Sequence, residues 1–113
     1  MLGWYLNRTY EIAVIGDFNE ILFASEKQCG QCRPQACMDK FKEALEFCEL
    51  DDLGFVGDVF TWRNHSHMAD RYIRERLDRA VATQAWRDMF PTYKVVNGEP
   101  RHSDHRPILI DTH

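Results

Sequence analysis

The chain has 113 residues, which is the usual size of a single domain. Its composition is 44% hydrophobic and 28% charged, as in ordinary globular proteins. The formal net charge of -4 excludes an overall electrostatic attraction to nucleic acid. No apolar run approaches the length of about 20 residues that spans a bilayer, so no membrane partner is expected.

Two features of the first third of the chain bear on the cell compartment. Residues 1–8 lack the basic start and the small-residue cleavage site of a secretory signal. Cys29 and Cys32 have metal-ligand spacing, but no second such pair follows. We therefore expect free thiols in a reducing compartment, and an intracellular protein that is nuclear or cytoplasmic.

The first half of the chain predicts a strand and a helix. The run Ile12–Ile15 predicts a short buried strand that ends at Gly16. After a polar loop, Pro34 opens a helix that reaches about Leu50. Its apolar residues recur at spacings of three and four, which predicts one stripe packed on a sheet; they are Cys37, Met38, Phe41, Ala44, Leu45 and Cys48.

The second half predicts mainly strands. One short helix is expected after a cap at Thr83, ending at Met89 or Phe90 before Pro91. The expected strands are Val59–Trp62, Ile73–Ala82, Tyr93–Val96 and Ile108–Ile110. We expect an α+β domain of the α/β sandwich type, with one mixed or antiparallel sheet and flanking helices.

Basic residues gather within the alternating run Ile73–Ala82 and just before it. They are Arg71, Arg74, Arg76 and Arg79. The alternation places Glu75, Leu77 and Arg79 on one strand face, and Asp78 on the other. The arginines have two readings that the sequence does not separate, a solvated strand face or a local nucleic-acid footprint.

Polar residues stand at the ends of two of the expected strands. Asp17 and Asn19 follow the first strand, and Asp104 and His105 precede the last one. If the backbone stays extended, Asp17 and Asn19 leave the same face. Phosphodiester hydrolysis needs a base that activates water, a metal and donors to the phosphoryl oxygens. Asp17 fits the base or a metal ligand, Asn19 and His105 fit the donors, and Asp104 fits a metal ligand.

Each half of this pattern alone has a simpler explanation. Gly, Asp and Asn are common turn residues after a strand, so Gly16-Asp17-Phe18-Asn19 by itself is as well explained by a turn. The two motifs occur at strand ends in the right order, with Arg76-Leu77-Asp78 between them. This combination favours a functional site, with Asp78 as the carboxylate that pairs with His105.

The chain resembles the C-terminal half of the endonuclease/exonuclease/phosphatase superfamily, a four-layered fold. In particular it is similar to the endonuclease domain of LINE-type (non-LTR) retrotransposons of plants. The matching segments cover nearly the whole chain in order; they are Val14–Leu22, Met38–Leu50, Asp52–Phe55, Phe60–Asn64, Glu75–Ala80, Trp86 with Phe90-Pro91, and Ser103–Ile110.

The resemblance implies a role for each candidate residue. It implies that Asp17 activates the attacking water, that Asn19 contacts the phosphate and that Asp104 is the metal-site carboxylate. It also implies that His105 binds phosphate and that Asp78 pairs with it. The implied cofactor is Mg²⁺ or Mn²⁺, with Asp104 and Asp17 as ligands. The implied partners are DNA and, in a parent polyprotein, a reverse transcriptase domain.

Two further residues are expected at the substrate. Arg76 belongs to the basic cluster, and Trp62 borders the polar segment, where an aromatic ring can stack on a base. Trp62 is equally well explained as a core residue. Trp86 is expected in the core, where it anchors the short helix.

The family domain is about twice as long as this chain, and its first half supplies a metal-binding Glu that has no counterpart here. We therefore expect residues 1–113 to form one partial domain that holds the metal loosely and is weak or inactive alone. The alternatives are a non-catalytic remnant or binding module, and a phosphatase or lipid phosphodiesterase. We also expect an exposed apolar sheet face and self-association through it; the residues expected there are Val14, Leu77, Val81 and Leu109.

Overall fold

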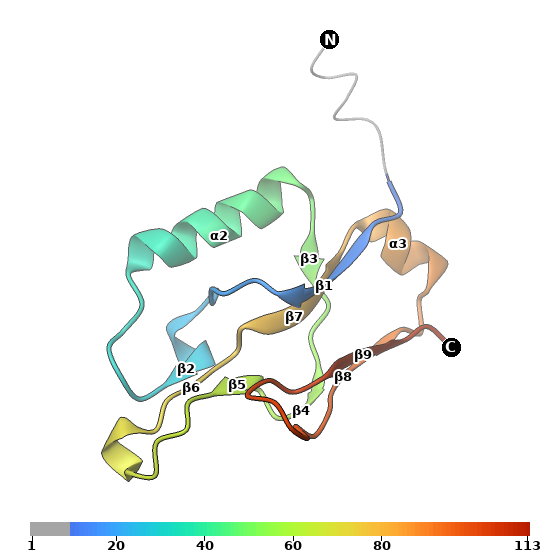
Figure 1. Ribbon diagram of the computed structural model, residues 1–113. Coiled ribbons are helices and arrows are strands. Elements are labelled where there is room, and N and C mark those ends of the chain that lie inside the picture. The colour runs from blue at the N-terminus through green and yellow to red at the C-terminus, as the bar shows by residue number, and fades with distance from the viewer. Residues whose placement is uncertain (1–9) are drawn as a thin grey trace.

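The computed structural model describes residues 10–113 and shows an α+β fold (Figure 1). The expected class is confirmed, but the expectation of one sheet is wrong. The strands of the described residues form three sheets of three strands each. The expectation about a secretory signal falls on residues 1–8, which lie outside the described part of the chain.

The first sheet places β7 (Asp78–Ala82) between β1 (Ala13–Asp17) and β3 (Asp51–Asp52). Both neighbours run antiparallel to β7. The register pairs Asp17 directly with Asp78, so two carboxylates face each other across adjacent strands. This pairing creates the polar end of the sheet.

The other two sheets are built from shorter strands. The second sheet has the order β2 (Lys27–Gln28), β6 (Arg74–Glu75) and β5 (Trp62–Arg63). The third has the order β4 (Val56–Gly57), β8 (Lys94–Asn97) and β9 (Ile108–Asp111). β4 runs parallel to β8, and β9 runs antiparallel to it.

The expected single strand Ile73–Ala82 is divided into β6 and β7, which belong to different sheets. At the break, the backbone amides of Leu77 and Asp78 both donate to the hydroxyl of Thr61, at 3.0 and 2.9 Å. This buried hydroxyl takes the place of a ladder carbonyl where the chain passes between sheets. Of the expected strand Val59–Trp62, only Trp62 lies in a strand, β5, so that prediction is wrong for residues 59–61.

Both expected helices are present. The long one, α2 (Gln35–Phe47), follows Pro34 as its N-cap and buries Met38 and Leu45. Cys37 and Cys48 are exposed instead of packing on the sheet, because the covered stripe is narrower than the pattern predicts. All cysteines are free, as expected.

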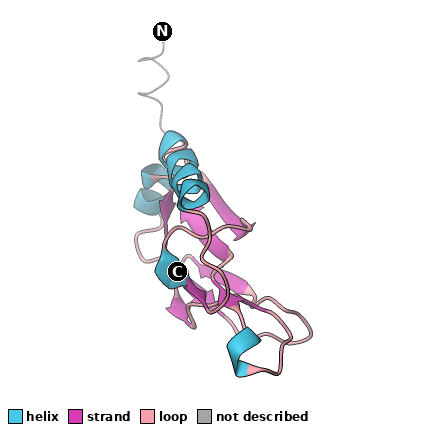
Figure 2. Cartoon of the chain, turned by 90° about the vertical axis from the view of Figure 1, so that its left-hand side faces the viewer, coloured by secondary structure: helices cyan, strands magenta, loops and turns pink. Residues whose placement is uncertain are grey.

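The short helix, α3 (Gln84–Met89), begins at the Thr83 cap, whose hydroxyl accepts the amide of Trp86 at 3.3 Å. Trp86 is buried against the first and third sheets, so the expected core role is confirmed. Two single-turn 3₁₀ helices, η1 (Ala24–Glu26) and η2 (Ala69–Arg71), complete the fold. Figure 2 shows α2 and α3 at one end of the molecule and η2 at the other.

The core lies on both faces of β7. On one face Ala80 and Ala82 pack with Leu53, Trp86 and Val95. On the other face, Val81 packs with residues of α2, of the segment before η1 and of the segment after α2; they are Leu22, Leu45, Phe18, Phe41 and Leu50. Val81 is covered in this way and Leu77 is buried with Ile21 and Met38, so the expectation that both are exposed is wrong.

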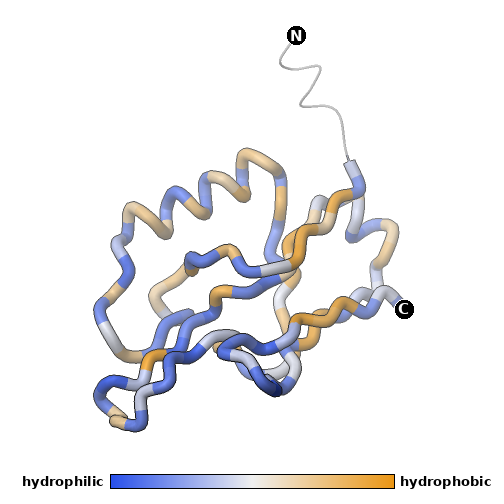
Figure 3. Tube along the Cα trace, in the orientation of Figure 1, coloured by the Kyte–Doolittle hydropathy of each residue, from blue (hydrophilic) through white to orange (hydrophobic). Residues whose placement is uncertain are grey.

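β1 departs from its expected burial in the opposite direction. Ile12, Val14 and Ile15 are 43%, 40% and 45% exposed, so the prediction of a buried strand is wrong. Among the described residues β1 pairs with β7 alone, which leaves its other edge open. This apolar segment is the orange stretch of β1 in Figure 3. Val14 and Leu109 are exposed, as expected.

Two of the four arginines of the basic run do not lie on a solvated strand face. Arg76 and Arg79 are 5% and 1% exposed and form a four-charge cluster with Glu26 and Asp52. Arg79 Nη2 lies 2.8 Å from Glu26 Oε1, and Arg76 Nη1 lies 2.7 Å from Asp52 Oδ2. The cluster ties η1, β3 and the start of β7 together.

The carboxylates of this cluster remain charged despite burial. Burial raises the pKa of Glu26, but hydrogen bonds and charge attraction from Arg79 outweigh it, so the net pKa is lowered. Burial likewise raises the pKa of Asp52, but the hydrogen bonds from Arg76 and from the Gly54 amide outweigh this effect, so the net pKa is lowered. Both acids therefore stabilise the folded state when ionised.

We expect the protein to lose stability on acidification below about pH 5. Glu26 and Asp52 have folded pKa values below their ordinary values of 4.5 and 3.8, so the unfolded chain binds more protons in that range. The contribution of these two acids to the free energy of unfolding is therefore fully present above their ordinary pKa values and is lost as the pH falls below them. Denaturant titrations across pH 3–7 measure this.

The matched variant is Glu26→Gln, which leaves two buried arginines short of one charge. We expect a loss of about 3–5 kcal/mol at pH 7 and a weaker acid dependence. Asp88→Asn, on the exposed side of α3, is the control and should retain both properties. An unchanged acid dependence in Glu26→Gln would contradict the role given to this cluster.

We also expect the chain to self-associate through β1. Its open edge carries apolar side chains and no lysine or proline, the devices that usually prevent edge pairing. Sedimentation should show association that Val14→Lys abolishes and that Phe47→Lys, on exposed α2, leaves in place. A monomer that resists concentration and binds no hydrophobic dye would overturn this expectation.

Candidate active site

Asp78 stands at the first position of β7 and is buried. Its backbone amide is held by the Thr61 hydroxyl at 2.9 Å, and the neighbouring Leu77 amide by the same oxygen. The carbonyl of Thr61 accepts the amide of Arg106 at 2.7 Å. Thr61 therefore links the strand that carries Asp78 to the segment that carries His105.

The His105 ring lies against Asp78. Its Nδ1 is 2.7 Å from Asp78 Oδ2. Because a carboxylate oxygen accepts, Nδ1 carries the hydrogen and Nε2 faces outward. The His105 backbone is held by a bridge to Trp62 and by the Ser103 hydroxyl, which accepts its amide at 3.1 Å.

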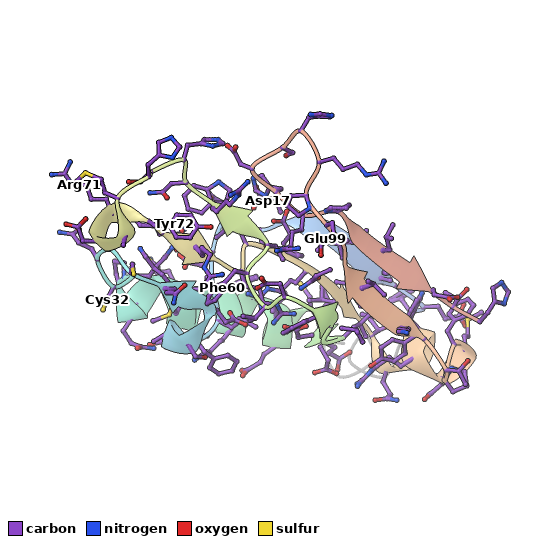
Figure 4. All side chains as sticks on the ribbon, turned by 90° about the horizontal axis from the view of Figure 1, so that it is seen from below. Asp17, Cys32, Phe60, Arg71, Tyr72 and Glu99 are labelled. Carbon is purple, nitrogen blue, oxygen red and sulfur yellow. The ribbon has the colours of Figure 1, made fainter. Side chains whose placement is uncertain are left out.

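Asp17 closes the group from the neighbouring strand. Its Oδ2 lies 3.9 Å from His105 Nε2, and its Oδ1 accepts the amide of Asn19 at 2.7 Å. The antiparallel register that pairs Asp17 with Asp78 puts both carboxylates beside the imidazole. Figure 4 shows Asp17 near the middle of the view, at the end of β1.

These side chains form one compact group, the His105 cluster, made of Asp17, Asp78 and His105. One ligand atom from each lies within 4.8 Å of the others. The Asp78 side chain is 10% exposed, whereas those of His105 and Asp17 are 34% and 45% exposed. The cluster is therefore anchored at Asp78 and open to solvent at Asp17.

Asn19 does not continue the strand. Its φ of +52° is left-handed, so the condition under which Asp17 and Asn19 would leave the same face, an extended backbone between them, is not met. β1 ends at Asp17, and the Asp17 carboxylate caps a turn by accepting the Asn19 amide. Arg33 Nη1 donates to the Asn19 carbonyl at 3.2 Å, and Arg33 Nε donates to Glu75 at 2.7 Å.

Asp104 is turned away from the group that was expected to include it. Its Oδ1 contacts Nε2 of His65, and it is not among the ligand atoms that gather around His105. Asp104 lies in a bend before the bridge residue His105, and its carboxylate contacts His65 instead of the cluster. The predicted convergence therefore holds for Asp17, Asp78 and His105, but not for Asp104.

The two predicted substrate residues have structural partners. Arg76 is buried in the four-charge cluster and also lies over the Phe55 ring, with 4.7 Å from its guanidinium carbon to the centroid. A side chain so enclosed is not available to a substrate, so its predicted role is wrong. Trp62 is half-buried against Ile21, Met38 and Leu77, which supports the core alternative for that side.

Two residues that hold the site in place were not predicted. Thr61 gave no signal because a threonine in a strand-like segment is ordinary. Arg33 lies in a loop, and its distant partners Asn19 and Glu75 cannot be inferred from spacing. The side-chain bond with Glu75 raises the pKa of Arg33 above its ordinary value.

The chemistry of the donors fits a divalent cation in part. Asp17 and Asp78 offer carboxylate oxygens, the ligands that Mg²⁺ and Mn²⁺ prefer. One oxygen of Asp78 is committed to His105, and one of Asp17 accepts the Asn19 amide. The described residues thus bring two partly engaged carboxylates to the cluster, and further ligands would be water or substrate.

Comparisons with known proteins yield no relative. No family model matches the chain, and neither a curated protein nor a solved structure matches it. Within the described residues no helix is both long and apolar enough to cross a membrane.

We expect Thr61→Val to loosen the site. The change keeps the shape but leaves the buried amides of Leu77 and Asp78 without an acceptor, which costs about 1–3 kcal/mol for each unsatisfied group. Thermal unfolding should show the loss, and the NMR signals of the His105 ring should shift. Thr61→Ser keeps the hydroxyl and is the control; equal behaviour of the two variants would refute the role of this oxygen.

Proposed function

We propose that this chain carries the phosphate-binding side of a metal-dependent phosphodiesterase site of the endonuclease/exonuclease/phosphatase type, with DNA as the substrate. The observation that supports it most is the His105 cluster, in which an imidazole is fixed by a buried carboxylate and faces a second, exposed one. The motifs and their order in the sequence point to the same residues.

In this proposal each member of the cluster has one role. Asp78 accepts the Nδ1 hydrogen of the His105 ring and so directs Nε2 outward, where the protonated ring donates its Nε2 hydrogen to a phosphoryl oxygen. Asp17, open to solvent, accepts the proton of an attacking water. Asn19, at the turn beside Asp17, presents its amide to the same phosphate, and Arg33 holds the carbonyl of that turn.

A divalent cation, when bound, neutralises the phosphate charge. Asp17 and Asp78 are the residues of the cluster that would hold it. We further propose that Asp104 becomes a third carboxylate ligand when its side chain turns from His65 to the cation. With two carboxylates at the cluster we infer weak cation binding and slow turnover.

The test is the nicking of supercoiled and abasic-site DNA with Mg²⁺ or Mn²⁺, together with Mn²⁺ binding measured by electron paramagnetic resonance. We expect measurable Mn²⁺ binding but little cleavage. Asp17→Asn should lower the residual cleavage by about 100-fold or more, the usual contribution of a positioned proton-transfer group. His105→Ala should lower it by about 100-fold as well, the usual contribution of a donor to the developing negative charge.

Asp88→Asn and His102→Ala are matched controls, because both residues are exposed and lie outside the cluster. They should retain binding and cleavage. Efficient turnover that Asp17→Asn abolishes would show that the inference of weak activity is wrong. Cleavage and cation binding that both survive Asp17→Asn and His105→Ala would overturn the proposed function and leave a non-catalytic binding module.

A further inference from the structure

A pocket with a volume of about 210 Å³, the Phe60 pocket, lies beside the His105 cluster. Its aromatic wall is formed by Phe60, Trp62 and Tyr72, and Arg63 and Arg74 line it too. The remaining lining residues are Asp58, Thr61, Glu99, Pro100, Asp104 and Arg106. Figure 4 shows Phe60, Tyr72 and Glu99 on the face that is seen from below.

Two arginines of the pocket face each other without an intervening acid. Arg63 and Arg74 are directly paired across β5 and β6. Among the described residues neither forms an ion pair with a carboxylate, and Arg74 is bonded to neutral Gln28 at 2.7 Å. Like charges directly opposite each other on adjacent strands destabilise a sheet. An anion between them would relieve this repulsion.

The acids of the pocket do not supply that anion. Arg106 Nη2 lies 3.2 Å from Asp58, and Arg106 Nη1 lies 3.5 Å from Glu99. Asp104 contacts His65. Asp58 and Glu99 are therefore paired with Arg106 and Asp104 is in contact with His65, so the charges of Arg63 and Arg74 remain available to a ligand.

The aromatic wall is suited to a flat ring. The Arg74 guanidinium carbon lies 4.6 Å from the centroid of the Phe60 ring and 5.8 Å from that of Tyr72. The bond to Gln28 fixes its position. Nucleobases stack on aromatic rings and on guanidinium planes in this way. The pocket thus combines a stacking surface with unneutralised cations.

The pocket adjoins the proposed phosphodiesterase site. Asp104 lines the pocket, and His105, the next residue, belongs to the cluster. Trp62 lines the pocket and forms the β-bridge to His105. A ligand in the pocket is therefore separated from the cluster only by the chain segment that contains Asp104 and by Trp62.

We propose that the Phe60 pocket binds one unpaired nucleotide of a DNA strand whose neighbouring phosphate lies at the His105 cluster. The base stacks on Tyr72 and the Arg74 guanidinium, and its own phosphate lies between Arg63 and Arg74. This inference rests on the proposed function and names its substrate class, a strand with an unpaired base.

The experiment compares two short single strands with equal numbers of phosphates, one of thymidine nucleotides and one wholly abasic, in the presence of Mn²⁺. Binding is followed by the tryptophan fluorescence of the chain, to which Trp62, at the pocket, contributes together with Trp4 and Trp86. We expect the thymidine strand to bind about 5- to 150-fold more tightly and to quench the fluorescence, since stacking of one base contributes about 1–3 kcal/mol.

Variants separate the base from the phosphate. Tyr72→Ala should remove most of the preference for thymidine without weakening the abasic strand, and Tyr72→Phe should restore it. Arg63→Gln should weaken both strands. Phe47→Ala, at an exposed aromatic residue of α2, is the control and should change neither.

The outcomes separate the two proposals. Equal binding of both strands, or a thymidine preference that survives Tyr72→Ala, would overturn the pocket and leave the proposed function. A thymidine preference in a protein whose binding is unchanged by His105→Ala would support the pocket and count against the cluster. Failure of both strands to bind would overturn both.

Discussion

The fold depends on four buried charges that would be costly if any one were left alone. Glu26 and Asp52 come from segments on either side of α2, and Arg76 and Arg79 come from the start of the central strand. Even within this cluster the Nε atoms of both arginines lack a partner among the described residues. A shift in the strand register of β7 would leave some of these charges buried and unpaired, which is strongly destabilising. The cluster therefore favours the one register in which all four charges are paired. The position of Asp78, two residues after Arg76, follows from it.

The buried ion pairs of Arg76 and Arg79 thus position the neighbouring Asp78, which is part of the His105 cluster. After Arg76, the backbone amides of Leu77 and Asp78 donate to the Thr61 hydroxyl as the chain enters β7. These hydrogen bonds restrict the backbone at Asp78, whose carboxylate accepts from His105. Asp17 is less constrained, since it belongs to an edge strand with exposed side chains. A fixed donor and a more mobile, solvated carboxylate suit a site in which one partner orients the phosphate and the other meets water.

Sequence patterns predicted the elements with strong local signals and missed what depends on distant partners. The helix after Pro34 and the cap at Thr83 follow from periodicity and capping chemistry, and Asp78 beside His105 followed from motif order. The alternation of residues 73–82 predicted one strand with a polar face. It missed the break at Leu77 and the burial of Arg76, because Glu26 and Asp52 lie far away in sequence. The orientation of Asp104 likewise depends on His65, which no motif singled out.

The left-handed backbone of Asn19 has a consequence for engineering. A non-glycine residue at φ +52° is held there at some conformational cost, which its neighbours, the Asp17 cap and Arg33, must offset. Glycine would adopt that conformation freely, so a library selected for heat resistance alone should enrich Asn19→Gly. It would thereby discard the amide beside Asp17. Robustness and activity would then be selected in opposite directions at one codon.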